Sequence, residues 1–494
     1  MNPHGYEVAA LAVRYSAPLP AGELDPAAFA VRADLDGPTP ETSSDGPRTV
    51  VRAFTAAGRD GAGSPGQEPA PGAWVVLELD TSDANAAGTF YSGTTQTYDL
   101  AAAYSVTQVA DLSVGATTVP ASLDPVAASA VDTPVVDEYE AGTWAGPGDA
   151  FRYRLFTPHA YREAPDDDTL YPLVLTLHGT GETGTDNAVQ LLGNQLSVAF
   201  AAPERQASDP AFVLSPQRAP DQDWLTPSGR EALVGMVEDL LDRYPVDPDR
   251  VYLTGLSRGS RASWPLLAED GELFAGALLV AGGESAELTA QIADLPVWVH
   301  HAIDDPTAPY GLTLTALEGL EHAGAVVTRG EWAGNLPRDA AAARAQALWD
   351  EARAAGSDVL HTAYSPGTTG TPDRLAYPHS SWIPTYANPV VLDWLFAQSR
   401  DGDPAVSVEA SARCLAGKAY VAVRATNDGD APVGVTLTTP YGSRTYSAVA
   451  PGVSAYQSFA SRATAFPAGT ATVTVTAGDG ITTLDAPYDA TTCG

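Results

Sequence analysis

The chain is poor in several residue types. Its 494 residues include two cysteines, two methionines and 26 basic residues against 61 acidic ones, so the formal net charge is −35. Lys418 is its single lysine. A surface this acidic repels phosphate backbones and anionic lipid. We therefore expect neither a nucleic acid nor a membrane surface as a partner.

Long apolar runs are missing as well. The longest candidate, around residues 275–283, has the length of a buried strand and falls short of the ~18 residues that a membrane span needs. The first residues, Met1–Gly5, show no basic region followed by an apolar one, so no signal peptide is visible. The sequence predicts a soluble protein.

The two cysteines, Cys414 and Cys493, bracket a segment at the C-terminal end of the chain. A pair at the two ends of a small β-domain is typical of a disulfide, which persists in an oxidising compartment. The alternative is two unrelated buried thiols, while the lack of a nearby histidine disfavours a metal site. We expect a disulfide, a secreted protein whose leader has been removed, and neither a metal nor a cofactor.

The sequence divides into three segments by its hydrophobic rhythm. Residues 1–137 alternate apolar and polar positions between Gly/Pro-rich turns, as in Trp74–Leu79, which predicts an all-β sandwich. Residues 401–494 repeat this pattern and predict a second sandwich, closed by the disulfide. Between them, residues 138–400 alternate strands with helices, which predicts an α/β domain with a largely parallel sheet.

In the middle segment the expected elements are specific. Strands are predicted at Leu173–His178, Phe212–Ser215, Val251–Leu256, Ala277–Ala281 and Val297–His301, and helices at Ser228–Tyr244, Arg258–Ala268, Arg338–Ala355 and Asn388–Gln398. Ser228 is the predicted N-cap of the first helix, because Glu231 follows it at capping-box spacing.

The strongest chemical signal is Gly255-Leu256-Ser257-Arg258-Gly259, between a predicted strand and a predicted helix. The glycines permit a sharp turn that exposes the serine hydroxyl above the sheet, so Ser257 is the candidate nucleophile. A nucleophilic serine needs a base and a carboxylate to orient that base. In α/β-hydrolases these follow in the order Asp, then His, which selects Asp305 and His379, with Asp304 as a rival. His300 and His301 are expected to serve packing and hydrogen bonding.

The tetrahedral intermediate of acyl transfer also needs backbone donors. The N–H of Arg258 and the glycine turn around Thr180, at residues 178–182, are the candidates. Trp224 and Trp382 follow a strand-end loop and the candidate base respectively, and could line a substrate pocket. Asp166-Asp167-Asp168 resembles a cation-binding run, but without further ligands at calcium-loop spacing a solvated turn is favoured.

Together these stretches resemble a known family. Residues 138–398 are similar to extracellular α/β-hydrolase esterases of the phospholipase/carboxylesterase and polyhydroxybutyrate-depolymerase-like group, related to feruloyl and acetyl-xylan esterases. The matching stretches are residues 172–182 with 185–187, 214–217, 247–260, 295–301 with Asp305-Pro306, and His379-Ser380-Ser381-Trp382. The N-terminal segment resembles the Ig-like domain that precedes some of these esterases. Residues 332–378 are longer than the family's usual connection, which predicts a lid-like or pocket-wall insertion.

The resemblance implies a serine carboxylesterase with Ser257, Asp305 and His379 as its triad and Thr180 and Arg258 at its oxyanion hole. Short-chain esters, acyl or feruloyl groups on polysaccharide, and polyesters are the expected substrates, so the partner is an ester that could be polymeric. Two alternatives remain open from the sequence. One is a serine peptidase of the same fold, and the other is a non-catalytic surface-binding protein.

Overall fold

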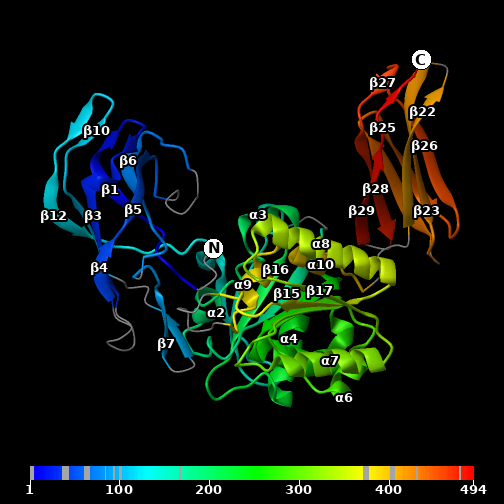
Figure 1. Ribbon diagram of the computed structural model, residues 1–494, viewed down its shortest axis with the longest axis horizontal. Coiled ribbons are helices and arrows are strands. Elements are labelled where there is room, and N and C mark those ends of the chain that lie inside the picture. Colours follow the sequence, from blue (N-terminus) through cyan, green and yellow to red (C-terminus); the bar gives the residue numbers. More distant parts are fainter. Residues whose placement is uncertain are drawn as a thin grey trace. The chain divides into compact units, whose positions relative to one another are not determined.

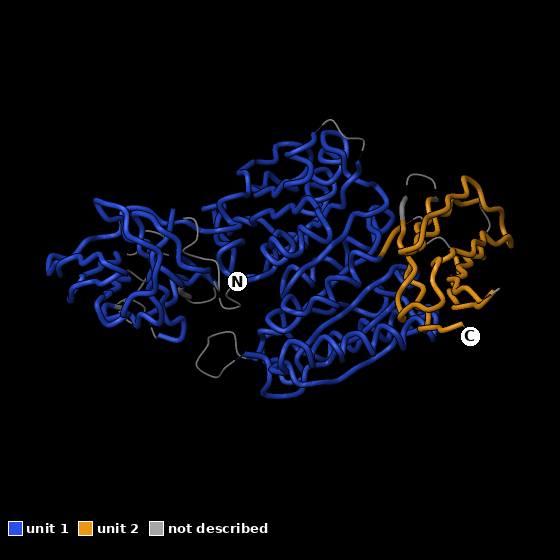
Figure 2. The backbone as a smooth tube through the Cα atoms, turned by 90° about the horizontal axis from the view of Figure 1, so that it is seen from above, with its two compact units in different colours: residues 1–397 blue, residues 398–494 orange. Residues whose placement is uncertain are grey.

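A computed structural model gives the fold of the chain (Figure 1). It describes residues 5–35, 44–59, 67–83, 85–92, 95–98, 103–165, 169–370, 378–400, 406–415, 417–429, 432–477 and 480–493. The aspartate run at residues 166–168 lies outside them. The chain forms two compact units, residues 1–397 and 398–494 (Figure 2). Within the described part of the chain, no helix has the length and apolarity of a membrane span.

The N-terminal part is a sandwich of two antiparallel four-stranded sheets. One sheet has the order β1-β6-β5-β2 and the other β12-β9-β3-β4. Alternate residues of strands such as β3 (Phe29–Leu35) point into a common core that includes Val31, Leu77 and Tyr104. The other strands are β1 (Ala10–Leu19), β2 (Glu23–Leu24), β4 (Ser44–Arg48), β5 (Val50–Ala56), β6 (Gly72–Leu79), β9 (Ala103–Gln108) and β12 (Ser122–Ala127). The predicted strand at Trp74–Leu79 therefore corresponds to β6.

A nine-stranded sheet forms the centre of the molecule, with the order β13-β14-β16-β15-β17-β18-β19-β21-β20. At one edge, β13 (Glu140–Thr143) pairs antiparallel with β14 (Arg152–Phe156), and β14 pairs antiparallel with β16. All the following pairs, from β16–β15 to β21–β20, are parallel. The parallel strands are β15 (Tyr171–Leu177), β16 (Phe212–Gln217), β17 (Val246–Leu256), β18 (Gly276–Val280), β19 (Val297–Ala302), β20 (Val327–Trp332) and β21 (Val359–Tyr364). This is the α/β-hydrolase architecture that the sequence predicted.

Helices cover both faces of this sheet, so its strands are buried on both sides (Figure 1). One face packs against α4 (Pro227–Arg243), α5 (Arg258–Asp270) and α7 (Tyr310–His322). The other packs against α8 (Arg338–Ala355), α9 (Trp382–Tyr386) and α10 (Pro389–Phe396). Parallel strands carry their carboxyl ends to one edge, where loops can bring chemistry together.

Two local predictions for this part of the chain were wrong. The N-cap of α4 is Thr226, whose hydroxyl accepts the N–H of Gly229, because Pro227 occupies the first helical position. Ser228 lies inside the first turn and donates to Asp149 instead. Over its described length the stretch 332–378 is not a lid, since it supplies α8 to one face and β21 to the sheet. The pocket-wall alternative stays a prediction.

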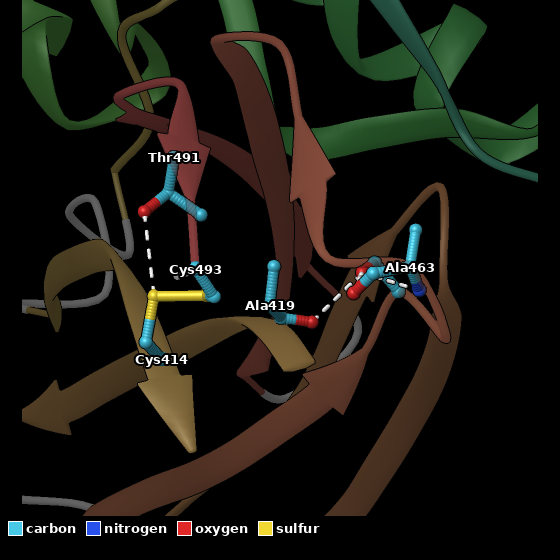
Figure 3. Close-up of a disulfide and its surroundings, with 6 residues drawn as sticks. Cys414, Ala419, Ala463, Thr491 and Cys493 are labelled. Carbon is cyan, nitrogen blue, oxygen red and sulfur yellow. Dashed lines mark hydrogen bonds between the residues drawn. A yellow bond between two sulfur atoms is a disulfide. The ribbon is translucent and has the colours of Figure 1, made fainter. Parts of the chain in front are cut away.

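The C-terminal unit is a second antiparallel sandwich. Its sheets have the orders β22-β23-β26 and β25-β24-β28-β29, with a short pair β27-β30. The strands are β22 (Val406–Leu415), β23 (Lys418–Asn427), β24 (Val433–Thr439), β25 (Gly442–Val449), β26 (Ser454–Ala460), β27 (Ala465–Phe466), β28 (Gly469–Ala477), β29 (Gly480–Tyr488) and β30 (Thr491–Thr492). Cys414 on β22 and Cys493 after β30 form a disulfide with a Cα–Cα distance of 5.6 Å (Figure 3). The predicted pairing is confirmed.

Candidate active site

Ser257 occupies a sharp turn between β17 and α5. Its backbone has φ 52° and ψ −115°, a conformation that a residue with a Cβ rarely adopts. The Ser257 N–H donates to the carbonyl of Val280 at 2.8 Å, which holds the turn against β18. The side chain stands half-exposed at the carboxyl end of the sheet, where a substrate can reach it.

The two glycines around Ser257 are required by close packing. A Cβ on Gly259 would lie 1.9 Å from the Leu177 carbonyl oxygen, and one on Gly255 would lie 2.6 Å from the Gly259 carbonyl carbon. The turn therefore sits directly on the end of β15, which carries the candidate oxyanion turn.

His379 joins Ser257 to Asp305. The Nε2 atom of His379 lies 2.9 Å from Ser257 Oγ, and its Nδ1 atom lies 2.5 Å from Asp305 Oδ2. The three residues are far apart in sequence and meet at the carboxyl ends of β17 and β19. Asp304 is turned away and accepts the backbone N–H of Gly367 at 2.8 Å. The structure thus brings Asp305, and not its rival, to the histidine.

The segment that bears His379 is tied to the sheet. Ser381 Oγ accepts the N–H of Ala302, the last residue of β19, at 2.9 Å, and the Ser381 N–H donates to the His379 carbonyl at 2.8 Å. These bonds connect the base and the loop of the acid to the same strand end, so their separation is fixed by the scaffold.

The Asp305 carboxylate is surrounded by donors. Burial raises its pKa, but hydrogen bonds from His301 and His379 and from the backbone outweigh burial and hold the pKa well below the ordinary value of 3.8. The Oδ1 atom accepts the N–H groups of Thr307 and Ala308 at 2.8 and 3.0 Å. Asp305 is therefore an anion throughout the neutral pH range.

The turn at residues 178–182 lies against the serine. A Cβ on Gly179 would fall 3.3 Å from the Ser257 Cβ. Below the turn, His178 is buried, and burial lowers its pKa to about 3. Its Nε2 accepts the Arg218 N–H, so Nδ1 carries the proton and donates to the Gly179 carbonyl at 2.6 Å. A neutral imidazole thus braces the turn while Thr180 stays exposed at its tip.

A buried carboxyl lies at the end of this turn. Glu182 Oε1 accepts from Asn194 at 2.8 Å, while Oε2 has no hydrogen-bond partner. Burial raises the pKa of Glu182, although the bond from Asn194 opposes this shift. Sequence reasoning placed Glu182 in the turn without foreseeing that it is buried, and it did not find Asn194.

The turn is also held from the N-terminal part of the chain. β7 (Thr89–Ser92) and β8 (Thr95–Tyr98) form a hairpin, and the backbone N–H of Gln96 donates to the Gly181 carbonyl at 2.5 Å. The Gln96 side chain is 2% exposed and donates to the Gly193 carbonyl at 3.1 Å. Both the candidate oxyanion turn and the segment that follows it are therefore bonded to this hairpin.

Comparison with known proteins shows what the chain is similar to. Residues 1–119 match the model of the esterase Ig-like N-terminal domain. The crystal structure of a thermostable esterase is similar over 81% of this chain and 97% of its own length, with 30% identity and a TM-score of 0.65. The chain belongs to this esterase family.

Two curated relatives match shorter stretches of this chain. NocK of Nocardia uniformis subsp. tsuyamanensis, assigned as an esterase, is 30% identical over 179 residues, 34% of this chain and 49% of the relative. Poly(3-hydroxyalkanoate) depolymerase C of Paucimonas lemoignei is 32% identical over 117 residues, 23% of this chain and 28% of the relative. This chain thus spans about half of the length of the first relative and little more than a quarter of the length of the second.

The remaining predicted site residues are Arg258, Trp382 and Trp224. The Arg258 side chain forms an ion pair with Asp223, with 3.1 Å between Nε and Oδ1, so it points away from the nucleophile while its N–H begins α5. Trp382 packs edge-on to His379, with ring centroids 5.1 Å apart. Trp224 is fully buried against Phe151 and His178, which favours support of the turn over substrate contact.

Proposed function

We propose that the esterase hydrolyses carboxylic esters with Ser257 as nucleophile, His379 as general base and acid, and Asp305 as the anion that orients the imidazole. The observation that carries this proposal is the continuous chain Ser257 Oγ–His379 Nε2–His379 Nδ1–Asp305 Oδ2, with distances of 2.9 and 2.5 Å. Asp305 accepts a hydrogen bond from the protonated Nδ1, which leaves Nε2 unprotonated and facing the hydroxyl.

The reaction proceeds in two steps. Ser257 Oγ attacks the ester carbonyl while its proton passes to His379 Nε2, and His379 then protonates the leaving alcohol, which leaves an acyl-serine. Water, deprotonated by His379, attacks this acyl group and releases the acid and the free serine. Asp305 stays ionised throughout and stabilises the imidazolium.

The oxyanion of each tetrahedral intermediate is bound by the N–H groups of Arg258 and Thr180. The N-terminus of α5 supports this assignment, because the Arg258 N–H belongs to its unpaired first turn and the positive end of the helix dipole points at the developing charge. The turn at residues 178–182 lies in van der Waals range of Ser257, as the Gly179 geometry requires.

The substrate classes are short-chain esters, acyl or feruloyl groups on polysaccharide, and polyesters, the last class supported by the similarity to a poly(3-hydroxyalkanoate) depolymerase. We further propose a three-domain chain, with Ig-like, catalytic and C-terminal sandwich domains at residues 1–137, 138–400 and 401–494. The disulfide supports an extracellular location, since such bonds persist under oxidising conditions.

Hydrolysis of p-nitrophenyl acetate, butyrate and octanoate and of methyl ferulate tests the proposal. We expect Ser257→Ala to lower kcat/KM by ~10³-fold or more, because the acyl-enzyme cannot form. The matched control is Ser260→Ala, which removes a buried hydroxyl three residues further along. Equal activity of Ser257→Ala and wild type would overturn the triad, and the rates along the ester series report the acyl group that the site accepts.

A further inference from the structure

A second imidazole contacts the carboxylate of the proposed triad. His301 Nε2 lies 3.1 Å from Asp305 Oδ2, the same oxygen that accepts from His379. The side chains of His301 and Asp305 are both fully buried. With Oδ1 occupied by two backbone N–H groups, each oxygen of this carboxylate has two donors. Of the two side-chain donors, His301 and His379, the chemistry proposed above uses only His379.

The surroundings of His301 determine where its proton lies. Its Nε2 faces two acceptors, Asp305 Oδ2 and the Ala308 carbonyl, each at 3.1 Å, so this nitrogen must carry hydrogen. Its Nδ1 lies 2.7 Å from Thr313 Oγ1. The Thr313 hydroxyl also lies 3.3 Å from the Gly282 carbonyl oxygen, and the shorter contact favours donation of its one proton to the unprotonated ring nitrogen. The neutral imidazole therefore has both nitrogens satisfied.

The groups around His301 leave Asp305 as its charged partner. Tyr310 on α7 packs edge-on to the His301 ring and bonds to His361 on β21. Burial lowers the pKa of His361 to about 4 and raises the pKa of Tyr310, so both are neutral between pH 5 and pH 9. His379 faces His301 across the shared carboxylate.

We propose that His301 is a positioning residue of the esterase, which occupies one lone pair of Asp305 Oδ2 and thereby fixes the orientation of the carboxylate toward His379. Two backbone N–H groups hold Oδ1, so without His301 the other oxygen, Oδ2, would be held by His379 alone and would interact more strongly with the protonated base. Because His301 and His379 share this oxygen, Asp305 holds His379 in position but stabilises the protonated form of His379 less than it would without His301. The proton that His379 has taken is then returned to the leaving alcohol more readily. This inference rests on the proposed triad.

The test compares pH profiles of kcat/KM for variants of two neighbouring histidines. His301→Leu removes the donor, whereas His301→Gln keeps an N–H group that can reach Asp305. We expect kcat of His301→Leu to fall ~10-fold with KM within ~2-fold, because a bond to a charged group is lost. The acidic limb of the His301→Leu profile should move to higher pH, since Asp305 then interacts more strongly with protonated His379. For His301→Gln, both kcat and the acidic limb should stay near wild type.

His300→Leu is the matched control. His300 is the preceding residue of β19, is equally buried, and bonds to the Tyr364 hydroxyl at 3.1 Å with no contact to Asp305. This variant should lose stability without moving the acidic limb. If His301→Leu fails to fold, His301→Asn, whose amide is too short to reach Asp305, should show the same shift.

An acidic limb at the wild-type position in both His301→Leu and His301→Asn would overturn the positioning role. Ser257→Ala in the same assay separates the two proposals. If Ser257→Ala is inactive and the acidic limb of the His301 variants does not move, only the positioning role of His301 is overturned. An active Ser257→Ala removes the triad itself.

Discussion

Ser257 is held in a backbone conformation that glycine tolerates best, although the proposed chemistry needs its hydroxyl. At φ 52° and ψ −115° a Cβ is strained, and such strain costs ~1–3 kcal/mol when the surrounding fold enforces it. The Val280 carbonyl and the contact with β15 enforce it here. The position of the proposed nucleophile is thus maintained at the expense of stability.

This strain gives a prediction that is independent of activity. Ser257→Gly and Ser257→Ala both lack the nucleophile, but only glycine relaxes the backbone, so Ser257→Gly should be more stable than Ser257→Ala by ~1 kcal/mol. Urea titration of the two variants, followed by tryptophan fluorescence, measures the difference. A Ser257→Ala protein that is as stable as Ser257→Gly would show that the turn is not strained.

At the same scale, the sequence predicted some residues of the site and missed others. Ser257, Asp305 and His379 could be selected because the elbow motif and the chain order restrict the choice. His301 was expected only to pack and form hydrogen bonds, since no local pattern tells which group a buried histidine contacts. The partner of Asp304 was equally invisible, because it lies 63 residues away on the segment that follows β21.

At the level of elements, strands were predicted well because a doubly covered sheet requires continuous apolar runs. The start of α4 was misplaced by two residues, since Ser228 and Glu231 have capping-box spacing while Pro227 makes Thr226 the better cap. The edge strands β13 and β14 and the paired strands β20 and β21 were not foreseen. β13 and β20 are partly exposed, and their identity depends on pairing that a sequence does not display.

The corrected cap can be tested by two alanine variants. Thr226→Ala should lower the free energy of unfolding by ~1 kcal/mol, because the N–H of Gly229 loses its acceptor. Ser228→Ala should cost less, since Ser228 is exposed and its hydroxyl bonds to Asp149 at the surface. Thermal unfolding measures both, and a larger loss for Ser228→Ala would contradict the cap assignment.

At the scale of the whole chain, the disulfide belongs to one of the two compact units. It closes a separation of 79 residues in the C-terminal sandwich, and cross-linking a loop of this length lowers the entropy of the unfolded chain by an amount worth ~4.5 kcal/mol. The residues proposed for catalysis all lie in the other unit. Stability and catalysis should therefore respond separately to loss of this bond.

Replacing both cysteines, as Cys414→Ser with Cys493→Ser, tests this separation. Calorimetry should show one transition moved to lower temperature, with the other unchanged. Ester hydrolysis at 25 °C should stay within ~2-fold of wild type, because no proposed catalytic group depends on the C-terminal sandwich. A parallel loss of activity and stability would mean that the two units unfold as one.

The hairpin that bonds to the oxyanion turn bears on how this protein can evolve. Its contact with Gly181 uses the backbone N–H of Gln96, a group that every residue except proline supplies. This bond therefore depends on the length and register of the hairpin, since an insertion or deletion would shift the donor off the turn. Replacing Gln96 by another residue than proline would keep this bond but remove the side-chain bond to Gly193. Recombination that replaces the N-terminal sandwich must therefore preserve the spacing of this hairpin.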